Sequence, residues 1–260
     1  MTSQAESETS MPLSEHLDEL RRRVLWAMAG LAVGVAAAMC LGGEILSLLE
    51  QPYLAVTTSR GGGQLLVLKA ADGFLIYMRV SLIAGLILAS PWVFYQFWAF
   101  VAAGLHQREK RYAILAVPCS AGLFVAGAAF FLFVAAVPLM RFFLAFNDSL
   151  GLATTLTLGN HIAMMTGMML AFGLGFQMPL VVALLGAMGL VSPGSLGKYR
   201  RHVIVILLIF AALVTSPSPI DQIALALPMW LLYELGILLV KLGNRQTGKK
   251  TFHGFRGIKN

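Results

Sequence analysis

Charged residues are scarce in this chain: Asp, Glu, Lys and Arg make up only 12% of its 260 residues, whereas 58% are hydrophobic. A soluble domain carries about 25% charged and about 45–50% apolar residues. The chain therefore has too little charge to cover a globule in water, which excludes an ordinary soluble enzyme and a disordered chain. It indicates a membrane protein with several spans, and at about 20 residues for each spanning helix the length accommodates six.

Cysteine is nearly absent as well, which excludes a disulfide-stabilised scaffold. Cys40 and Cys119 both lie in apolar stretches, with no neighbouring His and no metal-ligand spacing. We expect each to be buried as a small apolar side chain. No metal and no cofactor are expected.

The motifs of enzymes are also lacking. The chain contains no Gly-x-Ser-x-Gly, no His-Glu-x-x-His and no Gly-rich phosphate-binding loop. Its five histidines lie near the ends of apolar runs or in the tails, and Ser120 has no base in its own run. Because an intramembrane enzyme needs a nucleophile and a base, or a metal, the chain is not expected to be an enzyme.

What the chain does have is six apolar runs. The fifth and sixth are short and only residues 216–220 separate them, whereas residues 44–72 and 136–160 predict long external connections, the first with some helix. The fold class is therefore an all-α integral membrane protein with six transmembrane helices, of which the fifth and sixth are short. The runs cover about 24–43, 73–97, 112–135, 161–188, 202–215 and 221–241.

The runs form one domain at residues 12–241, between a polar N-terminus at 1–11, expected to be disordered, and a basic tail at 242–260. Just before the first run, apolar residues recur at helical spacing and predict an amphipathic surface helix that continues into the span. A cleavable signal peptide is the alternative, but the run is long for one and an acidic helix precedes it.

The basic residues, which give a net charge of +7, report the topology. With six spans both termini lie on one side, and that side then holds 15 of the 19 Lys and Arg. Cytoplasmic loops carry such an excess, so both termini are predicted to be cytoplasmic. A nucleic-acid partner is not expected, because no aromatic residues alternate with these basic residues on a polar surface.

Polar residues inside the apolar runs are candidates for function, because each costs free energy in hydrocarbon. Gln177 follows the small residues Gly173 and Gly175 and precedes Pro179, which suggests a polar docking point for a partner helix. The alternative is a hydrogen bond within its own bundle. Glu234 lies deep enough to need a partner that the sequence does not identify.

Two carboxylates on the basic side are further candidates. Glu19 precedes three arginines and Glu109 lies among Arg108, Lys110 and Arg111. Spacing favours local pairs, Glu19 with Arg23 and Asp18 with Arg22, because residues four apart face each other on a helix. The functional alternative is recognition of a cationic ligand, since a carboxylate accepts two hydrogen bonds from one Arg.

Several segments together resemble the TatC family, from about residue 12 to residue 240 and in that family's order. They are Glu15–Arg23, Ser90–Phe100, Gly104–Arg111, Phe172–Pro179, Gly189–Pro193, Ala224–Pro228 and Leu232–Glu234.

The resemblance implies the receptor core of the twin-arginine translocase, which exports folded proteins across the bacterial inner membrane with the proton motive force. It implies a concave, glove-like bundle of six helices. Expected partners are twin-arginine signal peptides, single-span TatA- and TatB-type subunits, the lipid bilayer and further copies of the chain.

The same resemblance implies roles for individual residues. Glu19 and Glu109 match the two glutamates that bind the signal peptide's arginine pair, with Phe100 and Arg21 beside them. Pro52 matches a proline of the first external loop.

Two positions depart from the family pattern. Gln177 stands where the family has a carboxylate, and an amide neither forms an ion pair nor takes up a proton. Asp221 lies three positions beyond the family's acid, so the family role of that acid is carried over to it only weakly. From its own place at the start of the sixth run, Asp221 is expected at the membrane interface as a helix cap.

A small-molecule secondary transporter with six helices is the competing class. Such transporters are built from repeats with broken helices at matching positions. Runs one to three and four to six show no such symmetry, because the external connections differ in length. A structural scaffold is the third class, and binding of a twin-arginine peptide would distinguish a receptor from it.

Overall fold

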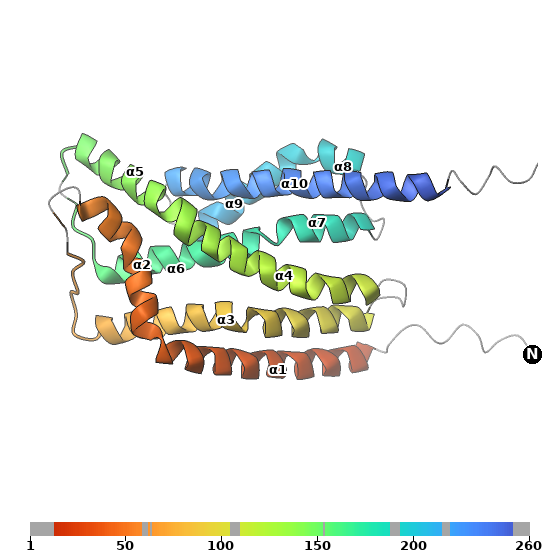
Figure 1. The fold of residues 1–260 in the computed structure, drawn as a ribbon, viewed down its shortest axis with the longest axis horizontal. Helices are drawn as coiled ribbons and strands as arrows, with labels where there is room; N and C mark the ends of the chain where they lie inside the picture. The colour runs from red at the N-terminus through yellow and green to blue at the C-terminus, as the bar shows by residue number, and fades with distance from the viewer. Residues whose placement is uncertain are drawn as a thin grey trace, which may run out of the picture. The chain divides into compact units, whose positions relative to one another are not determined.

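The computed structural model describes residues 13–58, 62, 64–104, 110–152, 154–187, 193–214 and 219–251 (Figure 1). Across these segments the regular elements are helices, and the β contact is an isolated parallel bridge between Leu66 and Thr157. The all-α fold class is confirmed. The helices are α1 (Leu13–Cys40), α2 (Gly42–Thr57), α3 (Asp72–Gly104), α4 (Lys110–Phe130), the π-helix η2 (Phe131–Ala135), α5 (Ala136–Ser149), α6 (Leu158–Gly175), α7 (Met178–Ala187), α8 (Pro193–Lys198), α9 (Arg200–Val214) and α10 (Pro219–Thr251).

Among the described residues, four helical stretches are long and apolar enough to cross a membrane: Glu15–Cys40, Asp72–Gly104, Ala113–Ser149 and Leu158–Ala187. Of the later helices, α9 is short, as predicted, with 15 residues. The helix α10 has 33 residues, and only its apolar stretch, Leu225–Leu238, is short. The count of six spans stays a prediction.

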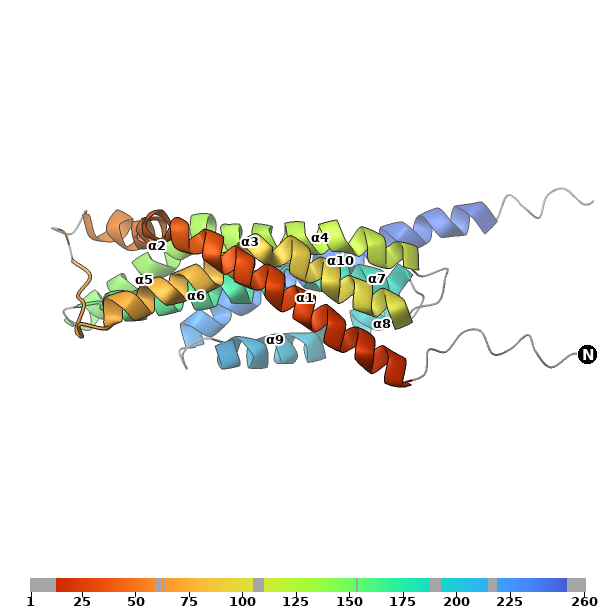
Figure 2. The ribbon, with the colours of Figure 1, turned by 90° about the horizontal axis from the view of Figure 1, so that it is seen from below.

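The chain divides into two compact units, residues 1–173 and 174–260. In the first unit α1 and α3 lie antiparallel, side by side (Figures 1 and 2). Glycines let them approach closely: a Cβ on Gly34 would lie 2.6 Å from the carbonyl oxygen of Gly85, and one on Gly85 would lie 2.5 Å from the Cα of Val35. Small residues allow this contact in a membrane, where apolar side chains gain little by leaving lipid.

A continuous helix runs from Lys110 to Ser149 through α4, η2 and α5. Pro138 lacks the N–H that would bond the carbonyl of Val134, and the π-helical turn falls at this interruption. At about 1.5 Å per residue, the apolar stretch Ala113–Ser149 is about 55 Å long, well beyond the ~30 Å of hydrocarbon. Much of the predicted second external connection, 136–160, is therefore a helix that continues the third span.

The two predicted external connections contain α2 and α5. The predicted helical part of 44–72 is α2, which packs against α3 and α5 and buries Leu49, Pro52 and Tyr53. At the end of α5, Gly151 has a φ of +70° and its N–H donates to Asp148 O, which is the turn that a helix-ending glycine allows.

The second unit packs α7 and α9 against α10. One cluster of its core is formed by Val182, Tyr233, Ile237 and Val240, with Leu196 and Val203 packed against it. The helix α10 continues past the predicted end of the sixth run at 241 and reaches Thr251, so the first part of the basic tail is helical.

The two cysteines correct the sequence analysis, because Cys40 and Cys119 are both exposed. In a membrane helix an apolar side chain is as stable in contact with lipid as in a protein core. Apolar neighbours in the sequence therefore do not predict burial. The outward faces of α1 carry exposed Leu25, Met28 and Val33 for the same reason.

We predict that Gly85→Ala destabilises the first unit by about 1–3 kcal/mol, because the new methyl group would overlap the backbone of α1. Thermal unfolding of the full chain in detergent, followed by circular dichroism, measures the effect. Gly122→Ala is the matched control, since a Cβ there meets nothing within 4 Å. Equal stability of Gly85→Ala and the control would contradict the close α1–α3 contact.

Candidate functional site

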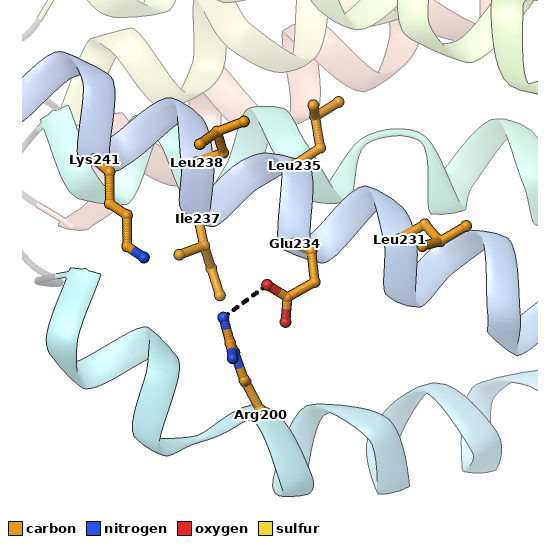
Figure 3. A pocket seen from close by; sticks show the side chains of 7 residues that line it. All are labelled: Arg200, Leu231, Glu234, Leu235, Ile237, Leu238 and Lys241. Carbon is orange, nitrogen blue, oxygen red and sulfur yellow. Dashed lines mark hydrogen bonds and ion pairs between the residues drawn. The ribbon is translucent and has the colours of Figure 1, made fainter.

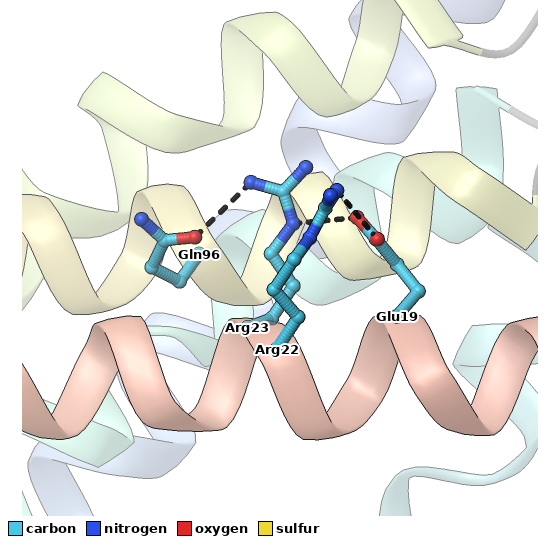
Figure 4. Close-up of polar contacts among 4 residues, drawn as sticks. All are labelled: Glu19, Arg22, Arg23 and Gln96. Atoms are coloured by element: carbon cyan, nitrogen blue, oxygen red, sulfur yellow. Dashed lines mark hydrogen bonds and ion pairs between the residues drawn. The ribbon is translucent and has the colours of Figure 1, made fainter.

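The cationic neighbours of Glu19 define the first polar site, on the N-terminal turns of α1. Its Oε1 accepts from Arg23 Nε at 2.7 Å, and its Oε2 lies 2.7 Å from Arg22 Nη2 (Figure 4). Two consecutive arginines of this chain thus occupy both oxygens of one carboxylate. The local pair of Glu19 with Arg23 is confirmed, whereas Arg22 pairs with Glu19 and not with Asp18, the partner predicted from spacing.

The two arginines are held very differently. Arg22 is 64% exposed, so water and salt compete with its ion pair. Arg23 is 23% exposed and its Nη1 also donates to Gln96 Oε1 on α3 at 3.1 Å (Figure 4). Because Gln96 is buried on α3, its hydrogen bond anchors Arg23 between the two helices. Arg22 is largely exposed and is free to turn away from Glu19.

An aromatic contact continues the site toward the ends of the two helices. The rings of His16 on α1 and Phe100 on α3 stack with centroids 4.5 Å apart and an angle of 26°. On α3, Phe100 follows Gln96 by four residues, and Gln96 follows Trp92, whose Nε1 donates to Trp26 O at 2.8 Å. Trp92, Gln96 and Phe100 therefore form one row that faces α1.

Arg21 is exposed on α1, and among the described residues no hydrogen bond or ion pair joins it to Glu19 or to the row on α3. Glu109, the second predicted carboxylate, lies outside the described residues. The places of His16 and Gln96 in the site were not predicted from the sequence. The signal that would have identified Gln96 is its place in a row of aromatics at a spacing of four.

Gln177 lies at the break between α6 and α7. Its backbone N–H donates to Leu174 O at 3.0 Å and its carbonyl accepts from Val181 N at 3.0 Å, while its side chain is half-buried. Pro179, two residues later, is buried, and a Cβ on Gly236 of α10 would lie 3.2 Å from its Cα. The amide thus stands at an interruption of the helix, whereas the proline packs against a helix of its own unit.

The small residues before Gln177 do receive neighbouring side chains, as the sequence predicted. A Cβ on Gly173 would lie 2.8 Å from the ring of Phe124, and one on Gly175 would lie 2.9 Å from Met229 Cε. Both contacts come from this chain, so these glycines serve its internal packing.

Two further predicted residues have structural places. Pro52 is buried within α2. Asp221 lies in the first turn of α10, and its side chain is outside the described residues.

The partner of Glu234 is supplied by the fold. Arg200 Nη2 donates to Glu234 Oε2 at 2.8 Å, across 34 residues of sequence. Beside it, Tyr233 donates from its hydroxyl to Leu196 O at 2.9 Å. Among the described residues, no three His, Cys, Asp or Glu lie together as a metal site would require.

The chain matches the family model of TatC, the Sec-independent protein translocase protein, over residues 15–228. Its sequence is 36% identical to the TatC protein of Desulforapulum autotrophicum over 94% of this chain and 87% of that protein. It is 33% identical to the TatC protein of Aquifex aeolicus, over 91% of this chain and 97% of that protein.

Solved structures agree with these sequence matches. The fold is similar to a crystal structure of the twin-arginine translocase receptor TatC in DDM, with a TM-score of 0.77 and 31% identity over 86% of this chain and 98% of that one. A second crystal structure of that receptor gives a TM-score of 0.76 at 32% identity, over 88% of this chain and 99% of that one.

We predict that Gln96→Leu lowers the free energy of unfolding by about 1–3 kcal/mol, because Arg23 would keep its place in the helix contact without one of its two acceptors. Gln51→Leu, at an exposed position of α2, is the control and should change little. Thermal unfolding of Arg23→Met, Gln96→Leu and the double variant in detergent gives the coupling energy. Strictly additive effects would show that this hydrogen bond contributes nothing.

Proposed function

This chain belongs to the TatC family of Sec-independent protein translocase proteins. From that premise we propose that the site on α1 and α3, from Glu19 to Phe100, receives the arginine pair of a twin-arginine signal peptide. As a translocase component in the membrane, the chain is not an enzyme. Similarity to the relatives gives no support to the alternative, a small-molecule transporter. The single observation that carries the site assignment is that Glu19 already binds two consecutive arginines of its own chain.

The proposed recognition step is an exchange of arginines at Glu19. The internal pair demonstrates that one carboxylate on this helix accommodates two guanidinium groups, each at 2.7 Å. Arg22 is the exposed partner and loses little when it turns into water, since an exposed ion pair is worth about 0.2–1 kcal/mol. An incoming arginine takes the oxygen that Arg22 leaves, while Arg23 and Gln96 keep the carboxylate oriented.

Discrimination between arginine and lysine follows from the shape of the two groups. A guanidinium is a planar fork that fits a carboxylate with two parallel hydrogen bonds, whereas an ammonium is a compact point charge. Phe100 offers a ring face on which a guanidinium stacks. Glu109 supplies the second carboxylate of the proposed site and Arg21 its basic flank.

The proposed orientation has both termini in the cytoplasm of a bacterium, with six spans in its inner membrane. The distribution of basic residues supports it, because 15 of 19 then lie on the cytoplasmic side. Signal peptides of unexported proteins are on that side, where α1 begins and α3 ends. The energy source is the proton motive force.

Partner subunits with single spans are proposed to dock near Gln177. The break between α6 and α7 supports this, because an interrupted helix presents polar groups at the depth where a partner helix passes. The docking contact is a hydrogen bond, since an amide carries no charge. Pro179 shapes the break, Pro52 and Asp221 shape the external segments, and copies of the chain associate in the assembled translocase.

We predict that Glu19→Gln weakens binding of a labelled Arg-Arg signal peptide roughly ten- to hundredfold, the loss of one charge-assisted contact of about 1.5–3 kcal/mol. The full chain in nanodiscs is titrated with the Arg-Arg peptide and its Lys-Lys counterpart. Glu15→Gln is the matched control, one turn earlier on the same helix and exposed. Equal binding of both peptides, unchanged by Glu19→Gln, would contradict the proposed site.

We also predict that Arg22→Gln tightens Arg-Arg peptide binding by about 1.4- to fivefold, because it removes an exposed competitor worth about 0.2–1 kcal/mol. The same titration measures it, and the gain should shrink in 1 M salt, where screening already weakens the internal pair. Weaker peptide binding by Arg22→Gln would mean that Arg22 supports the ligand and does not compete with it.

A further inference from the structure

A cleft of about 360 Å³ lies between α9 and α10 in the second unit (Figure 3). It is distant in sequence from the proposed signal-peptide site on α1 and α3. Its polar lining consists of Arg200 at the start of α9 and of Glu234 and Lys241 on α10. Figure 3 shows Arg200 extending from α9 toward Glu234, and the Lys241 side chain leaving α10 on the same side as Glu234. The signal-peptide proposal uses none of these residues.

The charges of this cleft do not balance. Glu234 neutralises one cation through its 2.8 Å bond from Arg200, and Lys241 remains as a second cation. Lys241 has no hydrogen bond or ion pair within the described part of the chain. The cleft therefore carries one excess positive charge, which a ligand with a single negative charge would neutralise.

A buried acceptor in the cleft is also unsatisfied. Glu234 Oε1 is buried and has no hydrogen-bond partner among the residues that the structure describes, although Oε2 of the same carboxylate binds Arg200. An unpaired buried oxygen of a charged group is destabilising, so a hydrogen-bond donor at this position would be favourable. A single ligand that fits the cleft must then carry both a negative charge and a hydrogen-bond donor.

The remaining lining is apolar and extends toward the membrane. Leu231, Leu235 and Leu238 follow each other along α10, and all three are exposed. They belong to the apolar segment Leu225–Leu238, and Lys241 lies three residues past its end. The charged end of the cleft is thus at the level where α10 leaves the apolar layer. From that level the three leucines extend along α10 into the apolar layer.

We propose that this cleft binds an anionic phospholipid, with its phosphodiester between Arg200 and Lys241, its headgroup hydroxyls donating to Glu234 Oε1, and an acyl chain along the three leucines. Phosphatidylglycerol has this combination of one negative charge and hydroxyl donors. Arg200 retains guanidinium N–H groups for the phosphate beyond the Nη2 that binds Glu234, since Arg has five donors. The lipid joins α9 to α10 at the membrane boundary.

Native mass spectrometry of the full chain in detergent tests this, with phosphatidylglycerol, phosphatidylmethanol and phosphatidylethanolamine of identical acyl chains as probes. We expect phosphatidylglycerol to be retained most strongly. Phosphatidylmethanol, with the same charge but no headgroup hydroxyl, should bind several-fold more weakly. Inorganic phosphate should not displace the lipid, because it lacks the acyl chain.

Lys241→Gln should reduce phosphatidylglycerol retention about tenfold, as expected for one lost charge-assisted contact, and Lys241→Arg should restore it. Arg201→Gln is the matched control: it removes the same charge from the residue beside Arg200, but Arg201 does not line the cleft. Lys241 is exposed, so its variants should unfold at the temperature of the unmodified chain.

Three results would overturn the proposal. Equal losses in Lys241→Gln and Arg201→Gln would mean general attraction of lipid to basic residues. Equal retention of phosphatidylmethanol and phosphatidylglycerol would show that no headgroup hydroxyl donates to Glu234. Displacement of the lipid by inorganic phosphate would make the cleft a site for a free anion. Peptide titration is independent of all three, so the signal-peptide proposal stands or fails separately.

Discussion

The close antiparallel contact of α1 with α3 is the interaction on which the proposed receptor site depends. At one level it rests on Gly34 and Gly85, whose missing side chains bring the two backbones together. Toward the N-terminus of α1 the same contact places Arg23 against Gln96 and His16 against Phe100. A shift of one helix along the other would separate every one of these pairs, because each joins one residue of α1 to one of α3.

A second constraint is that charge must be paired where the chain meets lipid. Glu19 is paired with Arg22 and Arg23, which lie three and four positions later on its own helix. Glu234 is paired with an arginine 34 residues away. The first pairing is local and easily exchanged, which suits a receptor. The second ties two helices together and leaves one carboxylate oxygen for a further donor.

The predictable part of the fold was the part encoded in local pattern. The apolar runs, the helical N-terminal segment, the helix in the first external connection and the short late helices all follow from composition and periodicity. The helix across 136–149 was not predicted, because once a chain leaves the bilayer nothing in its hydropathy distinguishes a continuing helix from a loop. The predicted burial of Cys40 and Cys119 was wrong for a related reason: lipid and protein interior are equally apolar.

The spacing of the sequence predicts the local pairing of Glu19 with Arg23 and the small-residue surface before Gln177. Each of the two depends on residues within a few turns of one helix. Gln96 and Arg200 entered their sites only through the tertiary structure. Their partners lie 73 and 34 residues away, and one sequence carries no information about which face of one helix meets which face of another. That choice is made by side-chain shape at the contact, at glycines such as Gly34 and Gly85, and it exists only once the helices have packed.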